Sequence, residues 1–107
     1  MNRLFKVFMR LSLEQIQQIK HHITDIYGGN TCVYLFGSRV DDAEKGGDID
    51  LLIEVETKEQ ASFENEFKLS GALQLALGPQ KIDLISHVRG QPANKIQQQA
   101  LQQGIRL

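Results

Sequence analysis

The sequence predicts a single α/β (α+β) domain, in which helices pack on a small mixed three-stranded sheet in the order α-β-α-β-α-β-α. The 107 residues are 41% apolar, which suits one compact core and leaves no room for two. Three short apolar runs, each bounded by glycine or charge, have the composition of strands. Longer segments between them repeat apolar residues at the three- and four-residue spacing of helices.

Helix signals place the elements along the chain. The first helix is expected over Ser12–Tyr27, because Ser12 and Gln15 form a capping box ahead of a stripe of isoleucines. Further helices are expected over Thr57–Leu77 and Pro92–Gln103, each followed by a glycine. A single helical turn fits between the first two strands.

Two phenylalanines of the middle helix admit two interpretations. Phe63 and Phe67 lie in one stripe with Leu73 and Leu77. Such a pair can stack on a nucleobase, or it can pack against the sheet. The continuation of the stripe into leucines favours packing in the core.

The strongest chemical signal lies in the first two strands. The run Cys32–Phe36 ends at Gly37-Ser38, and after nine intervening residues Asp48 and Asp50 open the second run. Side chains alternate along a strand, so the two carboxylates share one face, with Cα atoms roughly 6.6–6.8 Å apart. Adjacent carboxylates repel each other unless a cation lies between them. Mg²⁺ with a phosphate substrate is the commonest such case.

The Gly-Ser pair complements this acidic site. A small-residue pair where a strand turns into a helix leaves backbone N–H groups that can bind an anion, and the Ser38 hydroxyl can donate to a phosphate oxygen. If the two strands were parallel, Ser38 and Asp48 would lie at opposite ends of the sheet. The connection Arg39–Gly47 is short for a parallel crossover, so antiparallel pairing is expected.

A third strand is expected over Lys81–Ser86, and it carries an aspartate in the middle of an apolar run. This position requires an explanation, because burial of an unpaired carboxylate costs free energy of folding. Asp83 is either an exposed carboxylate paired with Lys81 or Arg89, or a third metal ligand. The second interpretation requires the third strand to run parallel to the second. Arg89 likewise has two interpretations: a contact to a triphosphate or a surface role.

Composition excludes some classes of function. A net charge of −1 does not suit a sequence-independent nucleic-acid binder. The single cysteine, Cys32, is expected in the core; it excludes an intrachain disulfide and fits a reducing cytoplasm. Residues 1–11 are too short and too charged for a membrane span or signal peptide. They are open to three interpretations: an edge strand, an amphipathic arm, or an extension ahead of a true start at Met9.

The order strand, Gly-Ser, about ten residues, Asp-x-Asp, strand resembles the nucleotidyltransferase superfamily of DNA polymerase β and kanamycin nucleotidyltransferase. Within it the chain resembles the minimal nucleotidyltransferases, which are small stand-alone proteins usually encoded beside a helical HEPN-domain partner. The resemblance covers about residues 12–107. It implies the nucleotidyltransferase fold over a single domain, residues 1–107.

The resemblance implies Mg²⁺-dependent transfer of a nucleoside monophosphate, AMP from ATP, to a hydroxyl on the HEPN-domain partner in a toxin–antitoxin type system. The implied residues are Asp48, Asp50 and Asp83 as catalytic groups and ligands of one or two Mg²⁺ ions, and Gly37, Ser38 and Arg39 for the nucleotide. The alternative is a non-catalytic antitoxin that neutralises its partner by complex formation. A homodimer remains open, and neither membrane insertion nor direct nucleic-acid binding is expected.

Overall fold

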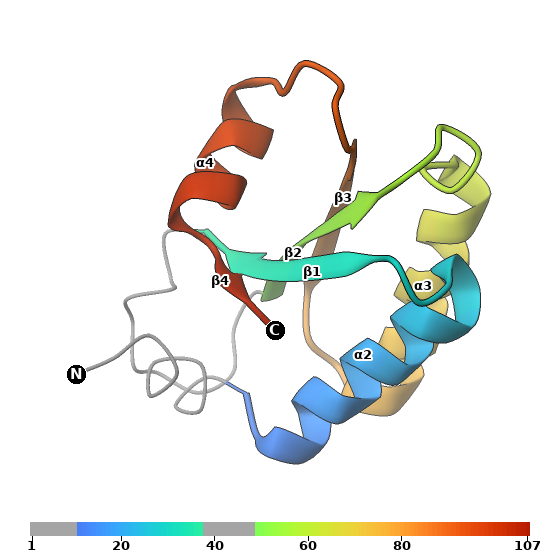
Figure 1. Ribbon diagram of the computed structural model, residues 1–107. Helices are drawn as coiled ribbons and strands as arrows, with labels where there is room; N and C mark the ends of the chain where they lie inside the picture. Colours follow the sequence, from blue (N-terminus) through green and yellow to red (C-terminus); the bar gives the residue numbers. More distant parts are fainter. Residues whose placement is uncertain (1–10, 38–48) are drawn as a thin grey trace.

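The computed structural model describes residues 11–37 and 49–107, which form three helices and four strands (Figure 1). In chain order they are α2 Leu13–Tyr27, β1 Cys32–Phe36, β2 Ile49–Val55, α3 Phe63–Leu77, β3 Ile82–Val88, α4 Lys95–Gln103 and β4 Ile105–Arg106. The strands make one sheet in the order β3-β2-β1-β4. None of these helices combines the length and the apolar character that a membrane-spanning helix needs.

The pairing of the strands confirms the predicted topology. β1 runs antiparallel to β2, and β2 runs parallel to β3 after the α3 crossover, so the sheet is mixed. The helical turn predicted between the first two strands falls within residues 38–48, outside the described residues.

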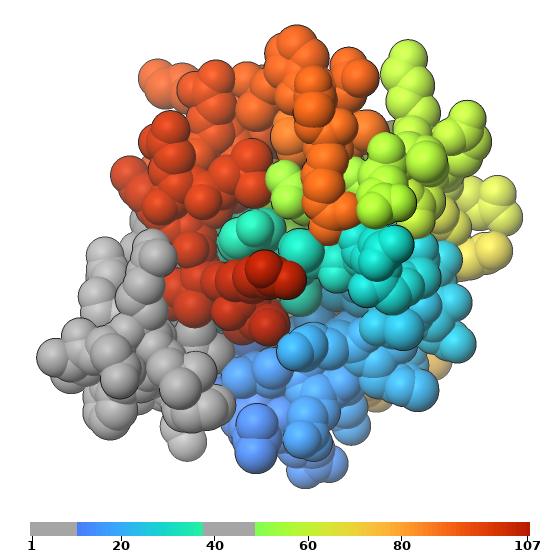
Figure 2. All heavy atoms as spheres, viewed as in Figure 1, coloured from blue at the N-terminus to red at the C-terminus, as the bar shows by residue number. Residues whose placement is uncertain are grey.

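The sheet has one strand more than the three predicted. Ile105 pairs with Leu35 and Arg106 with Tyr34, which adds β4 to the free edge of β1. In Figure 2 these C-terminal residues (red) run beside β1 (teal). Two residues are too few to show an alternating pattern, and their conformation is decided by the edge of β1 that they pair with.

The core lies between the sheet and the two helices α2 and α3, which cover the same face (Figure 1). Its main members are Ile16, Ile19 and Ile23 of α2, Ile49, Leu51, Ile53 and Val55 of β2, and Leu69, Leu73 and Leu77 of α3. Leu52 lies on the opposite side of β2 and is also fully buried, because α4 packs against that face. Side chains of β2 therefore alternate between the two faces as expected.

Each helix begins after a polar cap residue. Ser12 and Gln15 form the predicted capping box at the start of α2. α3 and α4 begin later than predicted, because Ser62 and Asn94 act as their N-caps. Their side-chain oxygens accept hydrogen bonds from backbone N–H groups that have no partner within the helix.

The predicted core face of α3 is wrong at its first two turns. Phe63 is 88% exposed and Phe67 is 79% exposed, whereas Leu69, Leu73 and Leu77 are buried. The leucines at four-residue spacing make a second stripe that shares its last two members with the predicted one. Spacing alone could not choose between the two stripes, and the helix is rotated so that the leucines face the sheet.

Tyr27, the last residue of α2, predicts a pH dependence of stability. Burial and, secondarily, the charge of Glu66 raise the pKa of the Tyr27 phenol from 10.0 to about 12. The folded state therefore favours the protonated phenol. Its contribution to the free energy of unfolding is complete below pH 10 and is lost as the pH rises through 12, on the order of 2 kcal/mol.

The measurement is urea unfolding of the wild type and of Tyr27→Phe at a series of pH values from 9 to 12. Between pH 10 and 12 the wild type should lose stability relative to the variant. Two stability curves that stay parallel over this range would show that Tyr27 ionises as easily in the folded as in the unfolded chain.

Candidate active site

Asp50 and Asp83 are neighbours across the parallel pair β2–β3, directly in register, and each is the second residue of its strand. Adjacent strands are about 4.7–4.9 Å apart and in-register side chains point to the same face. Asp50 is half-buried; the side chain of Asp83 is 53% exposed and lies 4.0 Å from Nζ of Lys81. Asp83 is therefore the exposed carboxylate near Lys81 that the first interpretation described, and it is also next to Asp50 on a parallel strand, as the second required; its role as a metal ligand stays a prediction.

Gly37 lies against this acidic pair. It follows β1 at the end where Phe36 pairs with Asp50, and its φ is 106°, in the region that favours glycine. A Cβ atom built on Gly37 would lie 2.5 Å from Oδ2 of Asp50, closer than atoms approach without a bond. Only a glycine lets the backbone pass so close to this carboxylate. The antiparallel pairing thus brings the glycine turn to the acidic site, as predicted.

Three predicted site residues, Ser38, Arg39 and Asp48, fall outside the described residues. In the sequence they directly adjoin described ones, since Ser38 follows Gly37 and Asp48 precedes Ile49. Within residues 11–37 and 49–107, no three Asp, Glu, His or Cys side chains gather into a metal site. The roles of these three residues stay predictions.

Arg89 lies far from the acidic pair. It follows β3, six residues after Asp83, which is roughly 20 Å along an extended strand. Its Nε lies 3.4 Å from Oε1 of Glu54 and its Nη1 lies 3.6 Å from Oε1 of Glu56, while Nη2 donates to Sγ of Cys32 at 3.2 Å. Of its two interpretations, the structure supports the ion-paired surface role.

The contact with Arg89 also corrects the predicted place of Cys32. Cys32 is half-buried and is not a member of the hydrophobic core. It occupies the same face of the sheet as Glu54, with which it is in register. Side chains alternate between the two faces of the sheet along β1. Val33 lies on the core face, so its neighbour Cys32 lies on the opposite face.

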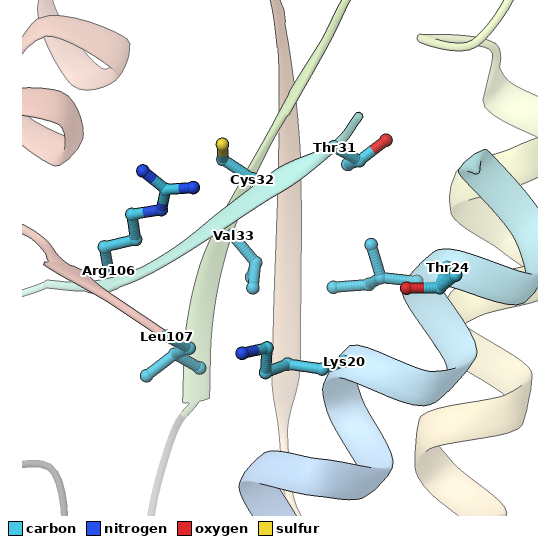
Figure 3. Close-up of a pocket in the computed structure, with 8 residues that line it drawn as sticks. Lys20, Thr24, Thr31, Cys32, Val33, Arg106 and Leu107 are labelled. Carbon is cyan, nitrogen blue, oxygen red and sulfur yellow. The ribbon is translucent and has the colours of Figure 1, made fainter. Parts of the chain in front are cut away.

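A small hollow between α2, β1 and the C-terminal residues is separate from the acidic pair (Figure 3). Its lining residues are Lys20, Ile23, Thr24, Thr31, Cys32, Val33, Arg106 and Leu107. Its volume of about 90 Å³ is well below that of ligand pockets. In Figure 3 Lys20 lies with Val33 on one side of β1, and Arg106 lies with Cys32 on the other. The two cations therefore do not converge on one ligand.

A larger groove, of about 220 Å³, lies beside Asp83. It is lined by Phe63, Glu66, Phe67 and Ser70 of α3 and by Ile82, Asp83 and Leu84 of β3. The helical pattern did not predict this groove, because it favoured a place in the core for the two phenylalanines. The leucine stripe of Leu69, Leu73 and Leu77 is a sequence signal for an alternative core face of α3, but its spacing does not distinguish it from the phenylalanine stripe.

The donor set of the acidic pair fits a hard divalent cation. Asp50 and Asp83 offer carboxylate oxygens from in-register positions of two adjacent strands, and oxygen is the ligand that Mg²⁺ prefers. Gly37 adds backbone without side-chain bulk at the same place. The arrangement can hold a cation between the chain and the phosphates of a ligand.

A mixed sheet with a glycine turn set against paired carboxylates is the arrangement of a nucleotidyl-transfer domain. The chain belongs to the polymerase beta nucleotidyltransferase family: the family model described as "Polymerase beta, Nucleotidyltransferase" matches residues 12–107. This match confirms the superfamily and the fold that the sequence motifs predicted. Comparison with curated proteins gave no match, and comparison with solved structures gave none either.

Proposed function

We propose that this protein is a minimal nucleotidyltransferase that transfers AMP from ATP, with Mg²⁺, to a hydroxyl of a HEPN-domain partner in a toxin–antitoxin type system. The observation that carries the proposal is the in-register pair of Asp50 and Asp83 beside Gly37. Membership of the family supports nucleotidyl transfer as the reaction type. When bound, Mg²⁺ would neutralise charge on the triphosphate and on the departing pyrophosphate.

Each residue of the site has a separate role in the transfer. An acceptor hydroxyl oxygen attacks the α-phosphorus and forms a new P–O bond, while the bond from that phosphorus to the bridging oxygen breaks and pyrophosphate leaves. Asp83, the more exposed carboxylate, takes the proton of the hydroxyl. Asp50 is fixed by β2 and by the adjoining Gly37, so with Asp48 and Asp83 it would hold the Mg²⁺ ion that orients the reacting phosphate. Gly37 and Ser38 bind the outer phosphates.

A protein acceptor suits the exposure of this site. Asp83 stands at the edge of the sheet with its side chain largely open to solvent. Water competes with an acceptor at an open site, and a bound macromolecule excludes it. A partner that covers the acidic pair would therefore supply the hydroxyl and also shield the site from water.

The test uses the purified chain, the protein encoded beside it, which we expect to be the HEPN-domain partner, ATP labelled at the α-phosphate, and Mg²⁺. We expect label on the partner, none when the label is on the γ-phosphate, and none when a chelator removes the metal. The other three nucleotides serve as controls for the choice of base.

One outcome would overturn the proposal in favour of the alternative. A tight complex that acquires no label with any of the four nucleotides would identify the protein as a non-catalytic antitoxin, which acts by covering its partner.

A further inference from the structure

We propose that the groove between α3 and the start of β3 docks an extended segment of the acceptor protein, with an apolar residue, a basic residue and the reacting hydroxyl. The proposal deepens the proposed function and rests on it. We call this surface, made by Phe63, Phe67, Ile82 and Leu84 with Glu66 and Asp83, the α3–β3 groove.

The aromatic side chains of the groove do not pack in the hydrophobic core. Phe63 and Phe67 are among the most exposed large hydrophobic side chains of the described residues, one helical turn apart on the same side of α3. The core face of that helix is made by leucines. Paired aromatic side chains that line a concave, mostly exposed surface are typical of the anchoring points of protein interfaces.

The backbone beside the groove offers an open strand edge. Ile49 N–H donates to the carbonyl of Lys81, and Arg89 N–H donates to the carbonyl of Val55, so odd-numbered residues of β3 direct their backbone groups toward β2. Backbone groups alternate along a strand, so those of Ile82 and Leu84 point outward. In the described part of the chain no strand pairs with this side of β3.

The other half of the same edge is closed. Nε2 of Gln97, on α4, donates to the outward carbonyl of Ser86 at 2.8 Å, and the carbonyl of Val88 accepts from Gln91 N–H. Covering an edge in this way prevents pairing with another chain. The open half is thus confined to the two residues that flank Asp83 and line the groove. An extended segment is the occupant that uses both the backbone edge and the aromatic side chains.

The position of the groove matches the direction from which an acceptor must approach. In phosphoryl transfer the attacking and leaving oxygens lie roughly in line, on opposite sides of the phosphorus. Gly37 at the end of β1 marks the side of the outer phosphates, and Asp50 on β2 lies next to it. Asp83 and the groove lie on β3, on the other side of Asp50. The acceptor hydroxyl therefore comes from the groove.

Charge restricts the segment further. Glu66 and Asp83 are the two charged residues that line the groove, and both are acidic. Ser86 Oγ donates to Oε2 of Glu66 at 3.0 Å, which fixes that carboxylate in place. An acidic rim around an apolar groove is complementary to a segment with lysine or arginine beside its apolar anchor.

The test compares Phe63→Ser/Phe67→Ser with Leu75→Ser, a matched control because Leu75 is 91% exposed on the same helix but does not line the groove. All three side chains are exposed, so both variants should fold. Calorimetry should show the affinity for the HEPN-domain partner falling at least about tenfold in the double variant and less than twofold in the control. Binding of ATP with Mg²⁺ should stay unchanged in both.

Three results would overturn the inference: unchanged affinity for the partner in the double variant, loss of ATP binding, or conversion of a homodimer to a monomer. The last two would assign the phenylalanines to a nucleobase or to a second copy of the chain. Because affinity is measured without turnover, the inference and the proposed function can fail separately. Weaker binding by the double variant supports the docking surface even if the wild type transfers no label. Unchanged affinity together with equal labelling by wild type and double variant would refute the docking surface and leave the proposed transferase activity supported.

Discussion

Replacing Asp50 or Asp83 by asparagine is expected to slow nucleotidyl transfer on the order of 10²–10³-fold or more. The two carboxylates are in register on adjacent strands, so both contribute negative charge to the same site. An amide of the same size keeps the shape but supplies neither the charge nor a strong ligand for a hard cation. The measurement is the initial rate of label transfer to the partner for each variant and for the wild type.

Stability and metal affinity distinguish this effect from a folding defect. Removing one of two like charges that face each other across a strand pair should leave the metal-free protein as stable, or about 0.2–1 kcal/mol more stable. Affinity for Mg²⁺ or Mn²⁺ in the presence of ATP should fall together with the rate. Asp25→Asn, an exposed position on α2, is the matched control and should change neither. Full activity in Asp50→Asn would show that the acidic pair takes no part in the reaction.

Replacing Gly37 by alanine is expected to abolish transfer as well, although position 37 carries no chemical group. The new methyl would lie 2.5 Å from Oδ2 of Asp50, so the carboxylate or the turn must move. In addition, a φ of 106° is strained for any residue with a Cβ, at a cost of about 1–2 kcal/mol. The measurement is the rate of label transfer together with the free energy of unfolding in urea.

Gly28→Ala separates the two effects. Gly28 follows α2 with a φ of 100°, close to that of Gly37, but an added Cβ there meets nothing within 4 Å. Both variants should therefore lose similar stability from backbone strain, and only Gly37→Ala should also lose activity. Equal activity in the two variants would mean that Asp50 does not need its present position.

The local elements were predictable because their signals are local. The capping box at Ser12, the isoleucine stripe of α2 and the glycines after α2 and α3 all act within one or two helical turns. The antiparallel pairing of β1 and β2 was predictable for a different reason. Their connection is short, and the Gly37 turn and the Asp50 carboxylate serve one site only if the strand ends meet.

Features that depend on contacts between elements distant in the sequence were not predictable in this way. β4 has two residues and is a strand only because β1 has a free edge. The face of α3 that packs on the sheet depends on the shape of the sheet, since two stripes reach Leu73 at three- or four-residue spacing, one through Ser70 and the other from Leu69. Cys32 and Arg89 are 57 residues apart in sequence, and only the folded sheet brings them into contact.

The sequence by itself determined the family of this protein, because a glycine turn and aspartates at the ends of apolar strands are sufficient to place it among the nucleotidyltransferases. The tertiary structure decided which of these groups meet. The parallel register of β2 and β3 makes neighbours of Asp50 and Asp83, and the rotation of α3 leaves Phe63 and Phe67 outside the core. The physical reason is that propensity and capping act over a few residues, whereas strand register and helix rotation depend on how side chains from elements distant in the sequence pack together.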